Sequence, residues 1–149
     1  MPTYFISGHV NLTEDEFKLH YKKRLDDLIM TKNDKIVVGN ANGADKMSFD
    51  YLVDNAYPPN LITVFHYGSG VPRSYYVSKG VNVIDGFDSY TKRDSHMTNN
   101  SDADILWIRP EDETKAIVEK EGKVYRPGRI SGTEINKNRR AKLSRKDIQ

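Results

Sequence analysis

Five short apolar segments, separated by stretches with helical periodicity, constrain the fold of this 149-residue chain more than any other feature. Each segment predicts a strand, and most of them lead through a polar turn into a helical pattern. Alternating strands and helices predict a mostly parallel sheet with helices on both faces. We therefore expect one α/β domain over residues 1–149, built as a three-layer sandwich. The predicted strands are Thr3–Ser7, Lys35–Val38, Leu61–His66, Val81–Ile84 and Ala103–Ile108.

The first two helices have recognisable boundaries. Thr13 is a candidate N-cap, and Glu16 completes a capping box with it. A second helix starts near Ala44 and ends before Pro58, which cannot continue it. The spacing of apolar residues predicts one buried face for the first helix, formed by Phe17, Tyr21, Leu25 and Leu28.

A third helix is expected after the fourth strand, capped by Asp88 or Ser89. Tyr90 and Met97 are one heptad apart and should both face inward, with Arg93 on the same side. Residues 109–129 alternate charged and apolar groups, which predicts a hairpin or another excursion.

The final helix begins at Thr133 and contains the basic run Lys137–Arg145. The net charge is only +2, so this run favours a solvated helix face over a nucleic-acid patch. The chain has no cysteine, and its four histidines lack the spacing of metal ligands, so we expect no metal and no cofactor. No apolar run approaches the length of a membrane span, and a cytoplasmic location is expected.

In a parallel α/β sheet, ligands bind where the carboxyl ends of the strands lead into helices. The turn Gly39–Asp45 is small and polar there, so its backbone N–H groups could approach an anion at the start of the next helix. Ser131–Thr133 repeats this arrangement and adds two hydroxyls. Both turns could equally be structural, since glycine also permits tight turns.

Four side chains near this edge are candidate ligand contacts. Asp45 could cap the second helix or bind a ribose or a base, and Arg93 could form a surface ion pair or bind a phosphate. Arg73 could reach a phosphate from its loop, and His9 follows a strand end directly.

The motifs at these positions resemble those of the SLOG superfamily, in the branch related to the YspA and YpsA proteins. Gly39–Asp45 is similar to its GG-x-x-GAD turn. Arg93–Met97, Ala103–Leu106 and Ser131–Thr133 are similar to its R-x-x-x-M helix, its AD-hydrophobic strand and its Gly-Thr helix start. The resemblance spans most of the chain except an apparent insertion at about 109–130.

The resemblance implies a Rossmann-like fold and a nucleotide or nucleotide-derived ligand, of the ADP-ribose or NAD type. More distant relatives include the lonely-guy phosphoribohydrolases and the DNA-processing protein. In the lonely-guy enzymes a catalytic glutamate lies three residues after the Gly-Thr threonine, where this chain has Asn136. An amide cannot act as a general base, and Glu134 lies two residues away on a different helix face.

We therefore expect a protein that senses or sequesters such a ligand, and that could form a homodimer. The alternatives are an N-glycoside hydrolase or deoxyribosyltransferase-like enzyme, with Glu134 or Asp45 as its acid, and a single-stranded nucleic-acid binder using the basic final helix. The expected ligand-binding residues are Ser7, Gly8, His9, Gly39, Asn40, Asn42, Gly43, Asp45, Arg73, Arg93, Ser131, Gly132, Thr133 and Asn136.

Overall fold

The structure is a computed structural model that describes residues 2–128 and 130–148, with side chains described as far as residue 143. Its centre is a five-stranded, fully parallel sheet with the strand order β4-β3-β2-β1-β5. The chain therefore crosses from β1 to β4 in one direction and then returns to the other side of β1. The strands are β1 (Thr3–Ile6), β2 (Lys35–Gly39), β3 (Ile62–Phe65), β4 (Asn82–Ile84) and β5 (Ala103–Ile105).

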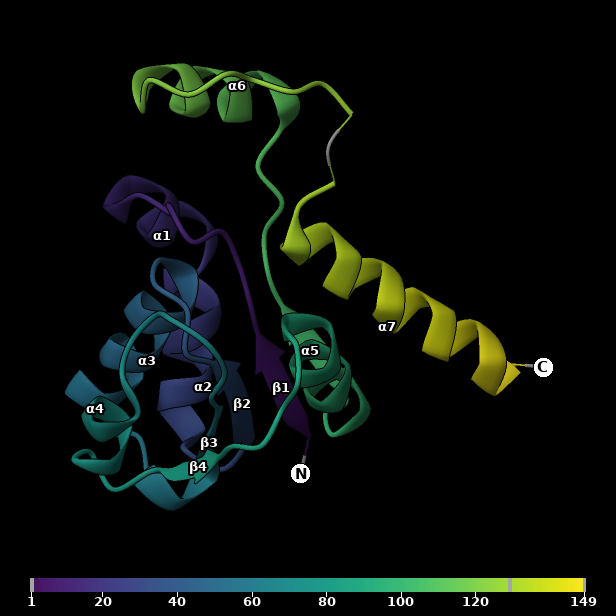
Figure 1. The fold of residues 1–149 in the computed structure, drawn as a ribbon. Helices are drawn as coiled ribbons and strands as arrows, with labels where there is room; N and C mark the ends of the chain where they lie inside the picture. Colours follow the sequence, from purple (N-terminus) through teal and green to yellow (C-terminus); the bar gives the residue numbers. More distant parts are fainter. Residues whose placement is uncertain (1, 129, 149) are drawn as a thin grey trace.

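Helices cover both faces of this sheet, which confirms the predicted three-layer, Rossmann-like α/β fold (Figure 1). One face is covered by α1 (Glu14–His20), α2 (Lys22–Thr31), α3 (Ala44–Asp54) and α4 (Arg73–Val77), with a short 3-10 helix (Pro59–Leu61) before β3. The other face carries α5 (Tyr90–Asn99) and α7 (Gly132–Ile148). A further helix, α6 (Glu111–Lys120), lies apart from the sheet.

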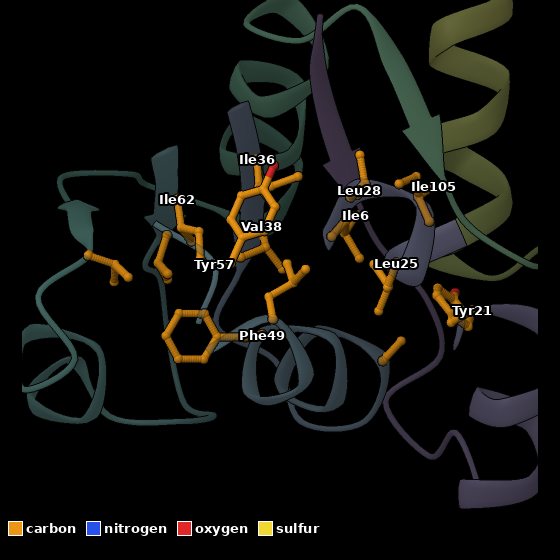
Figure 2. Close-up of a cluster of buried hydrophobic side chains, with 14 of the residues drawn as sticks. Ile6, Tyr21, Leu25, Leu28, Ile36, Val38, Phe49, Tyr57, Ile62 and Ile105 are labelled. Carbon is orange, nitrogen blue, oxygen red and sulfur yellow. The ribbon is translucent and has the colours of Figure 1, made fainter. Parts of the chain in front are cut away.

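The alternation of side chains along the strands divides the core in two. The larger cluster, shown in Figure 2, joins the sheet to α1–α4 and includes Ile6, Leu25, Ile36, Val38, Phe49, Ile62 and Ile105. The smaller cluster lies on the opposite face and comprises Phe5, Val37, Phe65 and Met97, with Phe87 packed against it. Residues adjacent in sequence, such as Phe5 and Ile6, thus pack against different layers.

The predicted start of α1 is confirmed in detail, but the predicted single helix is divided. Glu16 N donates to Thr13 Oγ1 and Thr13 N donates to Glu16 Oε1, which forms the expected capping box. Tyr21 ends α1 and precedes α2, and its side chain is fully buried. Its hydroxyl donates to Ser7 O (2.7 Å) and accepts from Trp107 N (3.2 Å), so Tyr21 links the ends of β1 and β5.

The expectation for α5 is correct for its cap and for two of three side chains. Ser89 Oγ accepts a hydrogen bond from Lys92 N, and both Arg93 and Met97 are buried. Tyr90 does not face inward as predicted, because it is the first residue of the helix and remains 48% exposed.

The segment after β5 is shorter in its strand part than predicted, and it continues as an excursion and not as a hairpin. The strand ends at Ile105, and residues 106–110 extend away from the sheet into α6, which has no buried residue. Residues 121–128 return toward α7, while Arg129 of the predicted insertion lies outside the described residues. We call residues 110–128 the arm.

Arg140 packs α7 against the rest of the domain, although the basic run that contains it was predicted to form a solvated helix face. Arg140 donates from Nη1 to Ser101 O (2.8 Å) and from Nη2 to Asp104 Oδ1 (3.0 Å). It thereby ties α7 to the end of α5 and to β5. Among the described residues, no helix is long and apolar enough to cross a membrane.

Candidate functional site

A large cleft opens at the carboxyl ends of β1, β2 and β5, where the strand order reverses. Its volume is about 1550 Å³, and it is bounded by the sheet edge, α5, the start of α7 and the arm. This is the expected ligand position in an open parallel sheet. The predicted site residues that line it are Ser7, Gly8, His9, Asn42, Asp45, Arg93, Ser131, Gly132, Thr133, Glu134 and Asn136.

Arg73 lies elsewhere. It is the first residue of α4, and its Nε donates to Asp85 Oδ2 at 2.7 Å, with both side chains about half exposed. It is not part of the cleft wall. Arg73 therefore has an ion-pair partner on the surface, and Arg93 is the arginine of the two that the fold directs into the cleft.

Gly39 leaves room for the Asp45 carboxyl and the Arg93 guanidinium at the end of β2. A methyl group on Gly39 would lie 2.8 Å from Asp45 Oδ2 and 3.1 Å from Arg93 Cζ, which is tighter than ordinary van der Waals contact. Asp45 belongs to the first turn of α3, whereas Arg93 comes from α5 on the other face of the sheet. Gly39 thus contributes to the site by having no side chain.

Arg93 is buried and is held by two neighbours. Its Nη1 donates to Asn40 Oδ1 at 3.0 Å, and its Nε donates to Asp94 Oδ1 at 3.0 Å. Its Nη2 also lies 3.0 Å from Asp94 Oδ1, so the guanidinium is fixed on one side by a carboxylate. Two of its five N–H donors form hydrogen bonds in this way, and Nη2 takes part in the ion pair.

Asn40 is hydrogen-bonded both to Arg93 and to the loop of residues 67–71. Its Oδ1 also accepts from Tyr67 N (3.0 Å), and its Nδ2 donates to Val71 O (3.3 Å). Its backbone oxygen accepts from Val71 N at 2.8 Å. Asn40 is fully buried and does not line the cleft, so it positions Arg93 and the 67–71 loop.

Asp45 is buried at the cleft wall with little compensation for its charge. Its Oδ2 accepts a long hydrogen bond from Ala41 N (3.3 Å). Burial raises the pKa of this carboxyl to about 7, because desolvation and the nearby Asp94 carboxylate outweigh the attraction of Arg93. With this pKa, the Asp45 carboxyl titrates near neutral pH.

The glycine-rich turn uses part of its backbone inside the protein. Gly43 has φ of +74°, and a side chain there would collide with the backbone oxygens of His9 and Val10. Ala44 N donates to His9 O at 3.0 Å, so one N–H at the start of α3 is already occupied. The part of this turn that reaches the cleft consists of Ala41, Asn42 and Asp45.

The His9 ring packs against Trp107, and it is hydrogen-bonded to the backbone of the segment that follows β5. Its Nε2 accepts from Arg109 N at 2.9 Å, which requires this nitrogen to be unprotonated. Burial and the charge of Arg109 lower the pKa of His9 to about 4, so the imidazole is neutral at physiological pH. This makes His9 a hydrogen-bonding residue and not a cation.

Arg109 was not identified from the sequence, although it lines the cleft. Its side chain is 2% exposed and donates from Nε (2.8 Å) and Nη2 (2.7 Å) to the two carboxylate oxygens of Glu16. Nη1 donates to Asn11 Oδ1 at 3.0 Å. Arg109 follows the predicted fifth strand directly, and that position at the switch in strand order could have identified it.

The start of α7 also lines the cleft. Ser131 Oγ accepts from Glu134 N at 3.1 Å and so caps the helix, while its O–H remains a potential donor. Thr133 and Asn136 are buried, and Asn136 Oδ1 accepts from Arg139 Nη1 at 2.7 Å.

Ser7 completes the wall at the end of β1. Its hydroxyl is buried and has no hydrogen-bond partner among the described residues. Buried hydroxyls are normally paired, so this one is a candidate contact for a bound molecule.

The fold and the cleft define a Rossmann-like α/β domain with a polar site at its topological switch point. The chain matches no protein-family model, and it has no significant match among curated proteins or solved structures. Within the described residues, no group of three or more His, Asp or Glu side chains is placed to hold a metal ion.

Proposed function

We propose that this protein binds a nucleotide or a nucleotide-derived molecule of the ADP-ribose or NAD type in the cleft, as a sensor or sequestering protein of the SLOG kind. The observation that carries the proposal is the buried guanidinium of Arg93 at the cleft wall. A buried arginine with unused N–H donors favours a bound phosphate or other anion. The cleft volume of about 1550 Å³ is ample for a dinucleotide-sized ligand.

The groups around Arg93 suit such a molecule. Phosphate oxygens would accept hydrogen bonds from Arg93 and from the first turn of α7, where the helix dipole is positive. Ser7 and Asn42 offer a hydroxyl and an amide for ribose oxygens.

The N-glycoside hydrolase remains a second candidate because of Asp45. An acid whose pKa is raised to about 7 can protonate the departing base of a nucleoside monophosphate near neutral pH. Glu134 also lines the cleft, and its backbone N–H is used in capping α7.

A thermal-shift panel tests the leading proposal. The purified chain is heated with AMP, ADP, ADP-ribose, NAD or cyclic dinucleotides, with inorganic phosphate as the control for charge alone. A ligand at a hundred times its Kd stabilises by about 2.7 kcal/mol, which is a clear increase in Tm for a domain of this size. No increase with any nucleotide would refute the proposal.

Chromatography of the same incubations separates binding from hydrolysis. The binding protein leaves every nucleotide intact. Release of free base that disappears in Asp45→Asn, but persists in Glu134→Gln, would establish the enzyme and identify Asp45 as its acid.

A further inference from the structure

An aromatic ring that the helical pattern placed in the core instead lies at the cleft. Tyr90 lines the cleft wall and is 48% exposed, whereas Met97, its heptad partner, is buried. Half-exposed aromatic rings in a polar cleft leave a flat apolar surface open to a ligand.

The position of this ring is fixed by its neighbours. The Arg93 guanidinium carbon lies 5.1 Å from the Tyr90 ring centroid, in a cation–π arrangement. The Tyr67 ring packs against Tyr90 at 87°, with centroids 4.7 Å apart, and Tyr67 donates its O–H to Asp88 O. Gly68, at φ of +68°, has no room for a side chain beside the Tyr90 hydroxyl.

Tyr90 therefore connects the anion-binding arginine to the open space of the cleft. Because Tyr90 and Arg93 are in contact and both line the cleft, one ligand can meet a cation and an aromatic ring together. Among nucleotide components, the phosphate suits the cation and the planar base suits the ring, because every base has a π-face.

We propose that Tyr90 is a ligand-binding residue that stacks on the base of the nucleotide, and that it makes the site prefer base-containing ligands over sugar phosphates. This inference depends on the proposed function, since it assigns the base-binding part of the same cleft. It adds Tyr90 to the proposed binding residues and a preference for ligands that contain a base.

The test compares the intact chain with Tyr90→Phe, Tyr90→Leu and Tyr90→Ala by isothermal titration calorimetry. The two probes are ADP-ribose and ribose 5-phosphate, which lacks a base. Tyr90→Phe keeps the ring and should bind ADP-ribose within about twofold of the unmodified chain. Leu and Ala should each weaken ADP-ribose binding by roughly tenfold, the effect of losing one stacked base, and leave ribose 5-phosphate unaffected.

Three outcomes would overturn the inference. Unchanged ADP-ribose affinity in Tyr90→Ala would show that the ring makes no contact with the base. An equal loss for both probes, in variants that keep their Tm, would show that Tyr90 only supports Arg93. If the unmodified chain binds neither probe and no nucleotide of the thermal-shift panel, the proposed function itself fails, and this result is distinct from the first two.

Discussion

The Asp45 carboxyl and the Arg93 guanidinium approach each other across Gly39, although they come from helices on opposite faces of the sheet. Gly39, the last residue of β2, has no side chain, so side chains from the helical layers on the two faces of the sheet come close together there. The cleft consequently has a cation and a titratable acid at one wall, and both depend on one glycine.

Gly39→Ala is predicted to destabilise the protein and to weaken ligand binding together. The new methyl would press on Asp45 and Arg93, and overpacking of this kind costs about 1–3 kcal/mol. Urea unfolding measures the stability loss. Gly132→Ala is the matched control, because no atom lies within 4 Å of its added methyl, and its stability should be unchanged. Equal stability of the two variants would contradict the packing described at Gly39.

The stability contributed by Asp45 is predicted to fall as the pH rises. Its pKa is about 7 in the folded protein and 3.8 ordinarily, so between these values the folded state holds the proton that the unfolded state has lost. The free energy of unfolding therefore decreases across this range, by an amount on the order of 4 kcal/mol.

Comparison with Asp45→Asn isolates this effect. The pKa of His9 is lowered to about 4, which makes stability rise with pH between about 4 and 6.5, but in both proteins alike. The stability of Asp45→Asn relative to the unmodified chain should increase from pH 4 to pH 7. A difference that does not depend on pH would show that Asp45 is not buried as a titrating acid.

Glu16→Gln is predicted to cost about 3 kcal/mol, because it leaves the buried Arg109 without its carboxylate. Arg109 holds the pKa of Glu16 at about 2, so the unmodified chain loses this stabilisation only as the pH falls from 4.5 toward 2. Glu14→Gln is the control, since Glu14 is an exposed acid in the same helical turn. Similar unfolding midpoints for the two variants would contradict a stabilising role for the Arg109–Glu16 pair.

Local patterns predicted the sheet, the caps and part of the cleft wall. The capping box at Thr13 and the Ser89 cap depend on neighbouring residues, and the carboxyl-edge rule requires only the order of strands and helices. Ser7, Asp45 and Arg93 were therefore found from their places in the chain.

The missed features depend on contacts between distant segments. The break at Tyr21 reflects hydrogen bonds to Ser7 and Trp107, and the burial of Arg109 requires Glu16, which lies 93 residues away. Heptad spacing placed Tyr90 inside, but it gives no information on whether the first turn of a helix projects beyond the sheet.

Arg93 is proposed to bind an anionic, nucleotide-derived ligand in the cleft. Calorimetric titration with ADP-ribose of the unmodified chain, Arg93→Gln and Arg73→Gln tests it most directly, because Arg73 carries the same charge outside the cleft. We predict binding that is weakened at least tenfold by Arg93→Gln and is unchanged within about twofold by Arg73→Gln, as expected for a charge-assisted contact. Affinity that survives Arg93→Gln in a folded protein, or that is lost equally in Arg73→Gln, would contradict the claim.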